Sequence, residues 1–552
     1  MAAKVTGDPV AISFAESDQL GEDKVVGLDV AVESLLSAYF RHGRGGAFFC
    51  HAEDDAGFAK FQARFAAAGG DPDSCTYLPA SDQNAFAPVS TLFRPDPDIA
   101  GFAAVRSRRD PRAYSVCGLS HTMSSLPAMA TVALFVAEPM QSWDAVICPS
   151  TAIRSVIETL WAAASQRAGR CPVQLPVIPL GVDTEGFARS ASGERRTKQR
   201  AALGIDDGDF AILFHGRLSY TSKAHPLPLL LAAERVAAAA ARSVHLVFYG
   251  YFTGDSFQAD YEALAQDICQ AARVHFVDNG DPRFPDALWA AADVFASLSD
   301  NIQESFGLTP VEAMASGLPV VASDWDGYRD TVTDGLEGFL APTLGPPPGA
   351  GVEAARRYLK GEDLYGEYLA AASQSTAVDV DAVAAALGRL EASGDLCREM
   401  GEAGMRRAGE VYDWRHVIPA YEELWDELAA RRKIDGESEP TSEHAVTDPA
   451  GLDPFRLFAS FPTRTLEDGH RIEAGPDAMQ GLTRLLGHRM NMFRPDLLLP
   501  ADDLPGLVAK LAVDGGVSVA DTTAAWPAGE RPRVMRTLAW LVKLGQARCR
   551  TA

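Results

Sequence analysis

Residues 293–322 read DVFASLSDNIQESFGLTPVEAMASGLPVVA and contain the local pattern that decides the fold. The apolar run Asp293 to Leu298 predicts a buried strand, and the polar residues after it predict a loop. Pro310 to Ser316 is expected to form a helix that Gly317-Leu318-Pro319 ends, before a second strand at Pro319 to Ala322. A strand, a loop, a helix and another strand in this order are typical of a βαβ unit with parallel strands.

The same alternation extends toward the N-terminus of this stretch. Three further apolar runs predict strands, at Phe210–His215, Val244–Tyr249 and Val274–Val277. The segments that follow them predict helices, at Pro228–Ala241, Phe257–Ala272 and Pro285–Ala292. These strands are apolar on both faces, as expected where helices cover both sides of a sheet. The segment from about residue 196 onward therefore predicts one complete α/β sheet.

An earlier set of elements predicts a second sheet of the same kind. Strands are expected at Val10–Phe14, Ala47–Phe49, Tyr114–Cys117 and Ala145–Cys148, and helices at Val25–His42 and Ala152–Ala164. We expect an α/β protein with two Rossmann-like, doubly wound lobes that face a cleft, plus a small and mainly helical C-terminal module.

The expected division of the chain follows from these patterns. Residues 1–190 form the N-terminal lobe and 191–435 the second lobe, whose last helix crosses back to the first. Residues 436–452 are polar and predict a linker, and 453–552 form the third module. The prolines within residues 344–351 predict a loop that opens an insertion near 345–376.

The third module permits two interpretations. Helical runs at Asp503–Val513 and Arg533–Leu544 fit a degenerate winged helix, in which Arg531, Arg533 and Arg536 would meet an anion. The alternative is a plain packing or partner-binding module. This region holds 13 basic and 11 acidic residues from residue 451 onward.

Charge and composition narrow the class of protein. The 552 residues are 47% hydrophobic and 22% charged, which is typical of a globular chain. Fifty basic against 74 acidic residues give a net charge of −24, and such a field repels a nucleic-acid backbone. A small phosphorylated ligand remains possible, because it needs only a local basic pocket.

Cysteine usage and hydropathy predict a cytoplasmic protein. None of the eight cysteines forms a CxxC pair, so neither a zinc site nor a disulfide framework is expected. The start of the chain lacks the apolar core of a signal peptide. The longest weakly polar stretch, Leu126 to Met140, is too short to span a bilayer, so membrane contact is expected only at the surface.

The loop and helix start at residues 301–312 carry the first candidate site. Glu304 follows the predicted strand, and the amides of Phe306, Gly307 and Leu308 lie where a helix dipole favours a phosphate or a sugar oxygen. Glu312, one turn further along, can accept hydrogen bonds from a diol. The alternative interpretation is structural, because Thr309-Pro310-Val311-Glu312 also fits a capping box.

A second loop supplies positive charge. The strand Phe210–His215 is followed by Gly216, Arg217 and, six residues after Arg217, Lys223. Arginine binds oxyanions in a bidentate fork and lysine acts as a point charge, so this pair suits a diphosphate. The structural alternative is a solvated basic loop. Two cations and two glutamates after different strands of one sheet favour the binding site.

Together these motifs resemble the retaining, GT-B-fold glycosyltransferases of family 4, also known as glycosyl transferases group 1. Residues 178–187, IPLGVDTEGF, resemble the family's inter-domain segment, and Asp413-Trp414 resembles its C-terminal pattern. The resemblance covers roughly residues 8–432. It implies a metal-independent enzyme without a cofactor, whose co-substrate is a nucleotide sugar bound mainly by the second lobe.

The resemblance also implies roles for single residues. Arg217 and Lys223 would hold the donor diphosphate beside Gly216, Glu304 the transferred sugar and Glu312 the ribose. The amides of Phe306, Gly307 and Leu308 would contact phosphate or sugar, Asn279 would lie near the base, and His121 would reach the sugar near its anomeric carbon. The structural alternative for His121 is a role in the fold alone.

Several positions depart from the family pattern. The first N-terminal loop reads AESDQLG at 15–21 instead of containing a glycine pair. The spacing from Arg217 to Lys223 is one residue longer than usual, which predicts a displaced Lys223. The insertion near 345–376 and the tail beyond 451 are expected to lie outside the resemblance.

The expected function is transfer of a sugar from a nucleotide donor to a hydroxyl acceptor. Glycan, lipid-linked and other hydroxyl acceptors are compatible with the sequence, and surface-glycan or polysaccharide assembly is the favoured context. The rival hypothesis is a non-catalytic sensor of sugars or nucleotide sugars, whose C-terminal interaction module transmits the signal. The sequence leaves the oligomeric state open.

Overall fold

The computed structural model divides into two compact units. The first comprises Met1–Asp183 with Glu410–Ala450, and the second Thr184–Gly409 with Gly451–Ala552. The structure describes residues 8–14, 27–44, 48–80, 82, 85–107, 110–168, 171–190, 193–284, 287–434, 453–475 and 477–550. The N-terminal loop at 15–21 and the predicted linker at 436–452 lie outside them. In the described part of the chain, no helix has the length and apolarity that a membrane span requires.

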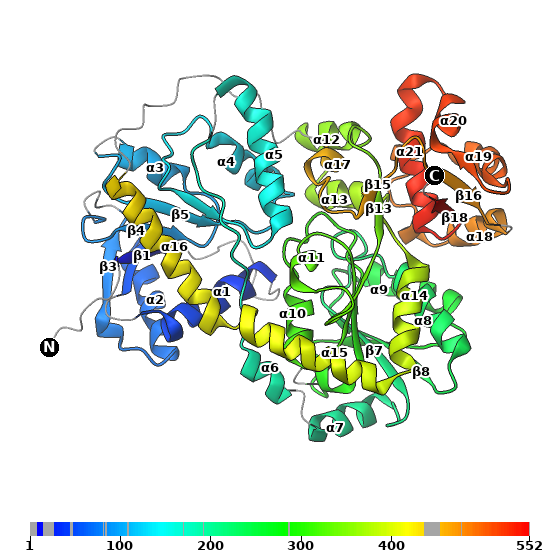
Figure 1. Ribbon diagram of the computed structural model, residues 1–552, viewed down its shortest axis with the longest axis horizontal. Coiled ribbons are helices and arrows are strands. Elements are labelled where there is room, and N and C mark those ends of the chain that lie inside the picture. The colour runs from blue at the N-terminus through cyan, green and yellow to red at the C-terminus, as the bar shows by residue number, and fades with distance from the viewer. Residues whose placement is uncertain are drawn as a thin grey trace. The chain divides into compact units, whose positions relative to one another are not determined.

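The first unit contains a six-stranded parallel sheet. Its strand order is β3-β2-β1-β4-β5-β6. The strands are β1 (Val10–Ser13), β2 (Phe48–Ala52), β3 (Cys75–Pro79), β4 (Thr91–Arg94), β5 (Ser115–Leu119) and β6 (Ala145–Ile147). Around them lie α1 (Gly27–His42), α2 (Asp55–Ala67), α3 (Ala100–Ser107), α4 (Leu126–Leu134) and α5 (Thr151–Ala168), as Figure 1 shows.

Helix α16 (Trp414–Ile434) belongs to the first unit, although it follows the second sheet in the sequence. The Trp425 ring lies 5.3 Å from Phe93 of β4 and 5.6 Å from Tyr39 of α1, measured between centroids. At the start of the helix, Trp414 packs so closely on Gly181 that a Cβ there would lie 2.4 Å from the indole. A helix that follows the second sheet in sequence therefore covers the first.

The second unit repeats the sheet with the order β12-β11-β10-β7-β8-β9, again all parallel. Its strands are β7 (Phe210–His215), β8 (Val244–Gly250), β9 (Arg273–Asp278), β10 (Val294–Ser297), β11 (Val320–Ser323) and β12 (Gly338–Ala341). Every residue of β8, β10 and β11 is buried, as expected for strands covered on both faces. Two doubly wound α/β lobes were predicted, and the structure confirms them.

Helices of the second unit alternate with these strands. They are α6 (Thr184–Ser190), α7 (Gly193–Leu203), α8 (Leu227–Ala239), α9 (Asp255–Ile268), α10 (Leu308–Ala315), α11 (Tyr328–Thr331), α12 (Val352–Leu359), α13 (Tyr365–Ser373), α14 (Val380–Glu391) and α15 (Gly394–Arg407). Short strands β13 (Thr343–Gly345) and β14 (Ala377–Val378) pair with each other in a separate sheet. The loop predicted at 344–351 is thus wrong for its first two residues, which end β13.

One predicted helix, Pro285–Ala292, is wrong in type. In the described residues 287–292 the chain forms only a 3-10 turn, Leu288–Ala291. Arg196 and Arg200 of α7 bind the carbonyl oxygens of Ala290, Ala291 and Ala292 at 2.8–3.2 Å. Because arginines take these oxygens, they are not engaged by the amides of a continuing helix.

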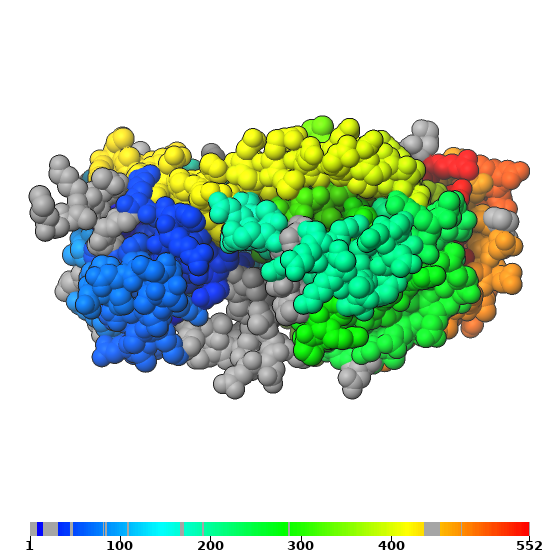
Figure 2. Space-filling model, turned by 90° about the horizontal axis from the view of Figure 1, so that it is seen from below, coloured from blue at the N-terminus to red at the C-terminus, as the bar shows by residue number. Residues whose placement is uncertain are grey.

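Residues 453–550, here called the C-terminal segment, belong to the second unit and pack on its earlier residues. The segment contains α17 (Pro454–Leu457), α18 (Ala478–Leu485), α19 (Leu504–Leu511), α20 (Val519–Ala524), α21 (Arg531–Lys543), and strands β15 (Arg464–Thr465), β16 (Arg471–Ala474), β17 (Val517–Ser518) and β18 (Ala547–Arg550). Strand β15 pairs in parallel with β13. In the space-filling view the orange and red atoms lie directly against the green ones (Figure 2).

The interior of the C-terminal segment bears on the two interpretations of this region. Strands β17, β16 and β18 form an antiparallel sheet, and α20 and α21 follow each other between β17 and β18. This order of helices and strands fits a degenerate winged helix. However, Arg536 of α21 is buried and donates hydrogen bonds to the carbonyls of Leu497 and Ala350. One of the three arginines expected to meet an anion is therefore used in packing instead.

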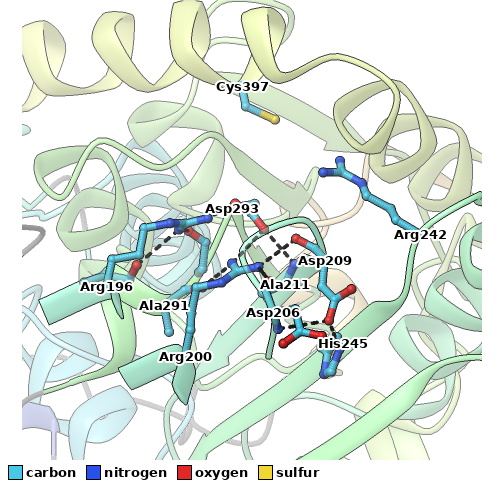
Figure 3. A network of polar contacts seen from close by, with 12 residues as sticks. Arg196, Arg200, Asp206, Asp209, Ala211, Arg242, His245, Ala291, Asp293 and Cys397 are labelled. Atoms are coloured by element: carbon cyan, nitrogen blue, oxygen red, sulfur yellow. Dashed lines mark hydrogen bonds and ion pairs between the residues drawn. The ribbon is translucent and has the colours of Figure 1, made fainter. Parts of the chain in front are cut away.

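A network of ion pairs joins the amino ends of three strands in the second sheet (Figure 3). Asp293, just before β10, accepts Arg196 at 2.6 Å and Arg200 at 3.2 Å, and binds the amide of Ala211 at 2.8 Å. Asp209 accepts a hydrogen bond from His245 of β8 at 3.1 Å. These charges fix α7 to the sheet edge opposite the carboxyl ends, so we interpret them as structural.

Substitution of Asp293 by alanine is expected to lower the free energy of unfolding by about 3 kcal/mol, because it leaves Arg200 buried without its carboxylate. Chemical denaturation measures the change. Arg235→Ala, which removes an exposed ion pair with Asp381, is the matched control and should cost under about 1 kcal/mol. Equal losses in the two variants would contradict the structural role of the Asp293 network.

Candidate active site

The candidate site lies where the strand order of the second sheet reverses. Strands β7 and β10 are neighbours, and the chain continues from β7 to β8 on one side and from β10 to β11 on the other. Loops that follow such a pair diverge and leave a crevice at the carboxyl ends, which is where open α/β sheets bind ligands. We call residues 216–225 the cation loop and residues 298–307 the glutamate loop.

Two contacts join these loops. Lys223 Nζ lies 2.6 Å from a carboxylate oxygen of Glu304, and a guanidinium nitrogen of Arg217 donates to the Gln303 side-chain oxygen at 2.5 Å. Arg217 also donates to the carbonyl of Ser222 at 3.1 Å. The longer spacing to Lys223 does not remove its ammonium from the site, because Lys223 reaches Glu304 from the neighbouring strand's loop.

Glu304 is held as a carboxylate. Burial raises its pKa, but the charge and hydrogen bond of Lys223, with a further hydrogen bond from Tyr328, outweigh burial and leave the pKa below its ordinary value. The Tyr328 hydroxyl also lies 2.8 Å from Ser297 Oγ at the end of β10. Glu304 is therefore positioned from two directions as an acceptor of hydrogen bonds.

Helix α10 begins at Leu308, with Gly307 as its N-cap and no side-chain cap. Thr309 lies inside the helix, so the capping-box interpretation of Thr309 and Glu312 is wrong. Gly307 has a φ of +94°, and a Cβ there would lie 2.4 Å from the Tyr328 ring. Only glycine allows the turn and this close ring contact.

Glu312 differs from Glu304 in the direction of its pKa shift. Burial raises the pKa of Glu312 to about 7, and nearby Lys223 opposes the rise only in part. Burial disfavours the ionised form of this carboxyl group. Hydrogen bonds donated by a ligand, such as a diol, would stabilise the ionised form. Two glutamates of one site thus have pKa values shifted in opposite directions.

The remaining two predicted contacts of this unit, Gly216 and Asn279, follow β7 and β9, with β8 between these strands. Gly216 has a φ of +146°, and a Cβ on Gly250 would lie 1.8 Å from the Gly216 carbonyl oxygen, so the ends of β7 and β8 approach closely. Asn279 follows β9 and is exposed, and its backbone amide donates to the Gly250 carbonyl at 3.1 Å. In the strand order β10-β7-β8-β9, the end of β9 lies two strands away from β7, the strand that precedes Lys223.

His121 belongs to the first unit, in the loop after β5. Its Nε2 lies 2.8 Å from the Pro95 carbonyl oxygen, which can only accept, so Nε2 carries the hydrogen and Nδ1 keeps a lone pair. Burial lowers the pKa of His121, and the Pro95 carbonyl and Asp96 oppose this in part. The ring is thus a neutral acceptor at its Nδ1.

Three residues that support the site have no signature in the sequence motifs: Gln303, Trp325 and Tyr328. Gln303 and Tyr328 hold Arg217 and Glu304, and the Trp325 indole donates to the Asn301 carbonyl at 3.0 Å. Trp325 and Tyr328 follow β11, the strand next to β10. Because carboxyl ends of adjacent parallel strands meet at one edge, this position was a signal that could have identified them.

Two other features of the described residues bear on ligands. No group of three histidine, cysteine, aspartate or glutamate side chains gathers there as a metal ion would require. In the first unit, α5 and residues 171–175 line a cavity of about 630 Å³ that includes Arg154, Glu158 and Trp161 but not His121. The sequence did not predict this cavity.

The paired cations and glutamates at these strand ends point to a class of protein, and comparison with known proteins identifies that class. Residues 195–375 match the family model of glycosyl transferases group 1. The resemblance predicted from the motifs is therefore confirmed for this part of the chain. The match runs through residues 345–375, so our expectation that this insertion lies outside the resemblance is wrong.

Individual relatives fit the same class. The chain is 30% identical over 270 residues to a D-inositol 3-phosphate glycosyltransferase from Geodermatophilus obscurus, covering 48% of this chain and 50% of the relative. It is 29% identical over 198 residues to an alpha-monoglucosyldiacylglycerol synthase from Streptococcus pneumoniae, covering 36% and 41%. The chain spans about a third to a half of the length of the first curated relatives it matches.

A solved structure supports the fold. The crystal structure of a glycosyltransferase from Rickettsia africae is similar with a TM-score of 0.52 and 12% identity, over 76% of this chain and 98% of that one. At this identity the likeness concerns the fold alone. It agrees with two doubly wound lobes in one chain.

Glu312→Gln is expected to stabilise the ligand-free protein at pH 8 by about 1–3 kcal/mol and to change little at pH 4.5. The folded state keeps the Glu312 proton up to a pKa of about 7, whereas the unfolded chain loses it near 4.5, so wild-type stability falls as the pH rises between these values. Thermal unfolding at both pH values measures the difference.

Glu304→Gln is the matched comparison with the opposite sign. Its carboxylate has a lowered pKa, so the ionised form stabilises the folded state and is lost as the pH falls. We expect this variant to melt below wild type at pH 8, and by less at low pH. If both variants shift the melting temperature in the same direction at pH 8, the two pKa shifts do not have opposite signs, and the prediction is wrong.

Proposed function

We propose that this protein is a retaining glycosyltransferase that moves a sugar from a nucleotide-sugar donor to a hydroxyl group of a glycan, lipid-linked or other acceptor. The observation that supports it most is the convergence of Arg217, Lys223 and Glu304 at the switch point of a sheet that matches the group 1 family model. Surface-glycan or polysaccharide assembly is the proposed context.

The two cations are proposed to bind the donor diphosphate. Lys223 contacts a carboxylate and Arg217 an amide oxygen, and phosphate oxygens of the donor would replace these partners. The same groups would stabilise the negative charge that develops on the leaving nucleoside diphosphate. Their charges would serve in place of a metal ion, and the scheme needs no cofactor.

The acceptor groups are proposed to bind hydroxyls. Glu304 would accept from the transferred sugar, and Glu312 from the ribose. Phosphate or sugar oxygens would contact the backbone amides at the start of α10, those of Phe306, Gly307 and Leu308. Gly216, which has no side chain, would leave room for the diphosphate. Asn279 would lie toward the base, and His121 of the first unit would accept from a sugar hydroxyl at Nδ1.

The proposed reaction proceeds on one face of the sugar. The bond between the anomeric carbon and the donor phosphate oxygen breaks, and a bond from the same carbon to the acceptor oxygen forms on that face. The acceptor proton passes to the leaving phosphate oxygen, so the anomeric configuration is retained. Arg217 and Lys223 would hold that phosphate while it accepts the proton.

Arg217→Ala and Glu304→Ala are each expected to lower kcat about 10²–10³-fold, because each removes a charged contact to the reacting groups. A panel of uridine, guanosine and adenosine diphosphate sugars is incubated with hydroxyl acceptors, and nucleoside diphosphate release is measured. The exposed Arg235→Ala variant is the control and should retain wild-type turnover. The anomeric configuration of the product is read from proton NMR coupling constants.

Each result bears on the proposal. Unchanged turnover in both variants would refute the site, and an inverted product would refute retention. Binding of a nucleotide sugar without turnover on any acceptor would favour the non-catalytic sensor.

A further inference from the structure

The C-terminal segment reaches the glutamate loop through a buried ion pair. Lys543, the last residue of α21, contacts the Asp300 carboxylate and the Ser373 carbonyl oxygen, and the Lys543 and Asp300 side chains are 2% and 1% exposed. Asp300 stands four residues before Glu304. A charge from the end of the chain is thus placed at the base of the candidate active site.

Hydrogen bonds continue from this ion pair into both loops. Asn301, next to Asp300, donates its side-chain amide to the Thr221 carbonyl of the cation loop at 2.8 Å and accepts the Gln303 amide at 2.9 Å. Gln303 in turn accepts Arg217. The position of Asp300 is therefore linked to one of the two proposed phosphate-binding cations.

Further contacts from the C-terminal segment reach the same loops. The Met490 carbonyl accepts His225 at 3.0 Å at the end of the cation loop, and Phe493 lies 5.8 Å from the Tyr220 ring. Phe461 packs edge-on against Trp325, 5.4 Å between centroids, and Trp325 binds the Asn301 carbonyl. Three separate places in the segment thus support the site from behind.

A buried ion pair is weak evidence for stability, since apolar residues of similar volume often serve as well. One Asp300 oxygen, Oδ1, also lacks a hydrogen-bond partner within the described residues. An ion pair that is costly to bury and lies next to a binding loop is better explained by a positioning role: it fixes the backbone conformation of residues 300–304.

We infer that Lys543 is a positioning residue for the donor site, and that the C-terminal segment is a structural part of that site. The inference rests on the proposed binding of a nucleotide donor by the second unit. It assigns to the last hundred residues a role in donor affinity, exerted through Asp300 and Asn301. The alternative is that the ion pair only attaches the segment to the fold.

The test uses the full chain and three variants. Lys543→Met removes the charge, Lys543→Arg keeps it, and Lys543→Met with Asp300→Leu removes both charges without leaving one unpaired. Lys510→Met is the control, because Lys510 belongs to the same segment, is only half-buried and donates to the Asp521 carbonyl. Calorimetry gives the affinity for uridine, guanosine and adenosine diphosphates, thermal melts report folding, and kinetics give kcat and the donor KM separately.

We expect the folded double variant to bind the preferred nucleoside diphosphate about ten- to a hundred-fold more weakly than wild type, with the loss in donor KM larger than in acceptor KM. Lys543→Arg should recover most of the affinity, and Lys510→Met should match wild type. If Lys543→Met fails to fold, the double variant decides the question.

Other outcomes separate the two proposals. A folded double variant with wild-type affinity and donor KM would overturn the positioning role and leave the ion pair as an attachment of the segment. A wild-type protein that binds none of the three diphosphates would instead refute the proposed function itself.

Discussion

The parallel pairing of β7 with β10 is the constraint on which the second unit depends. Ile212 pairs with Val294 and Leu213 with Phe295, and from these strands the chain proceeds to opposite edges of the sheet. This single register brings the cation loop and the glutamate loop to one crevice, although Lys223 and Glu304 are 81 residues apart in sequence. The Lys223–Glu304 ion pair and the Arg217–Gln303 hydrogen bond then join the two loops.

Apolar patterning predicted most of this architecture because buried parallel strands are apolar on both faces. The strand predicted at Phe210–His215 has those bounds, and four others of the second sheet differ by one residue at one or both ends. Strands β3, β4 and β12 were missed. Only one of the five residues of β3 is buried, so this strand lacks the continuous apolar run that identified the others.

The site was predictable where a single loop carries the chemistry and not where support comes from elsewhere. Arg217, Lys223 and Glu304 are charged residues in loops that follow predicted strands, so the sequence pattern alone indicates them. Gln303 and Tyr328 matter only through the contacts they make, and Lys543 lies 243 residues from its partner Asp300. No local pattern reveals such pairs, because they are set by packing between distant segments.

The first unit has a consequence for biosynthesis. Its sheet is encoded before residue 184, yet α16, which covers it through Trp425 and Tyr421, is encoded after residue 413. A nascent chain therefore carries the apolar faces of β4 and α1 uncovered while the whole second sheet is being synthesised. The lobe that begins first is completed later than most of its neighbour, and until then it is the part of the chain most exposed to aggregation or to capture by a chaperone.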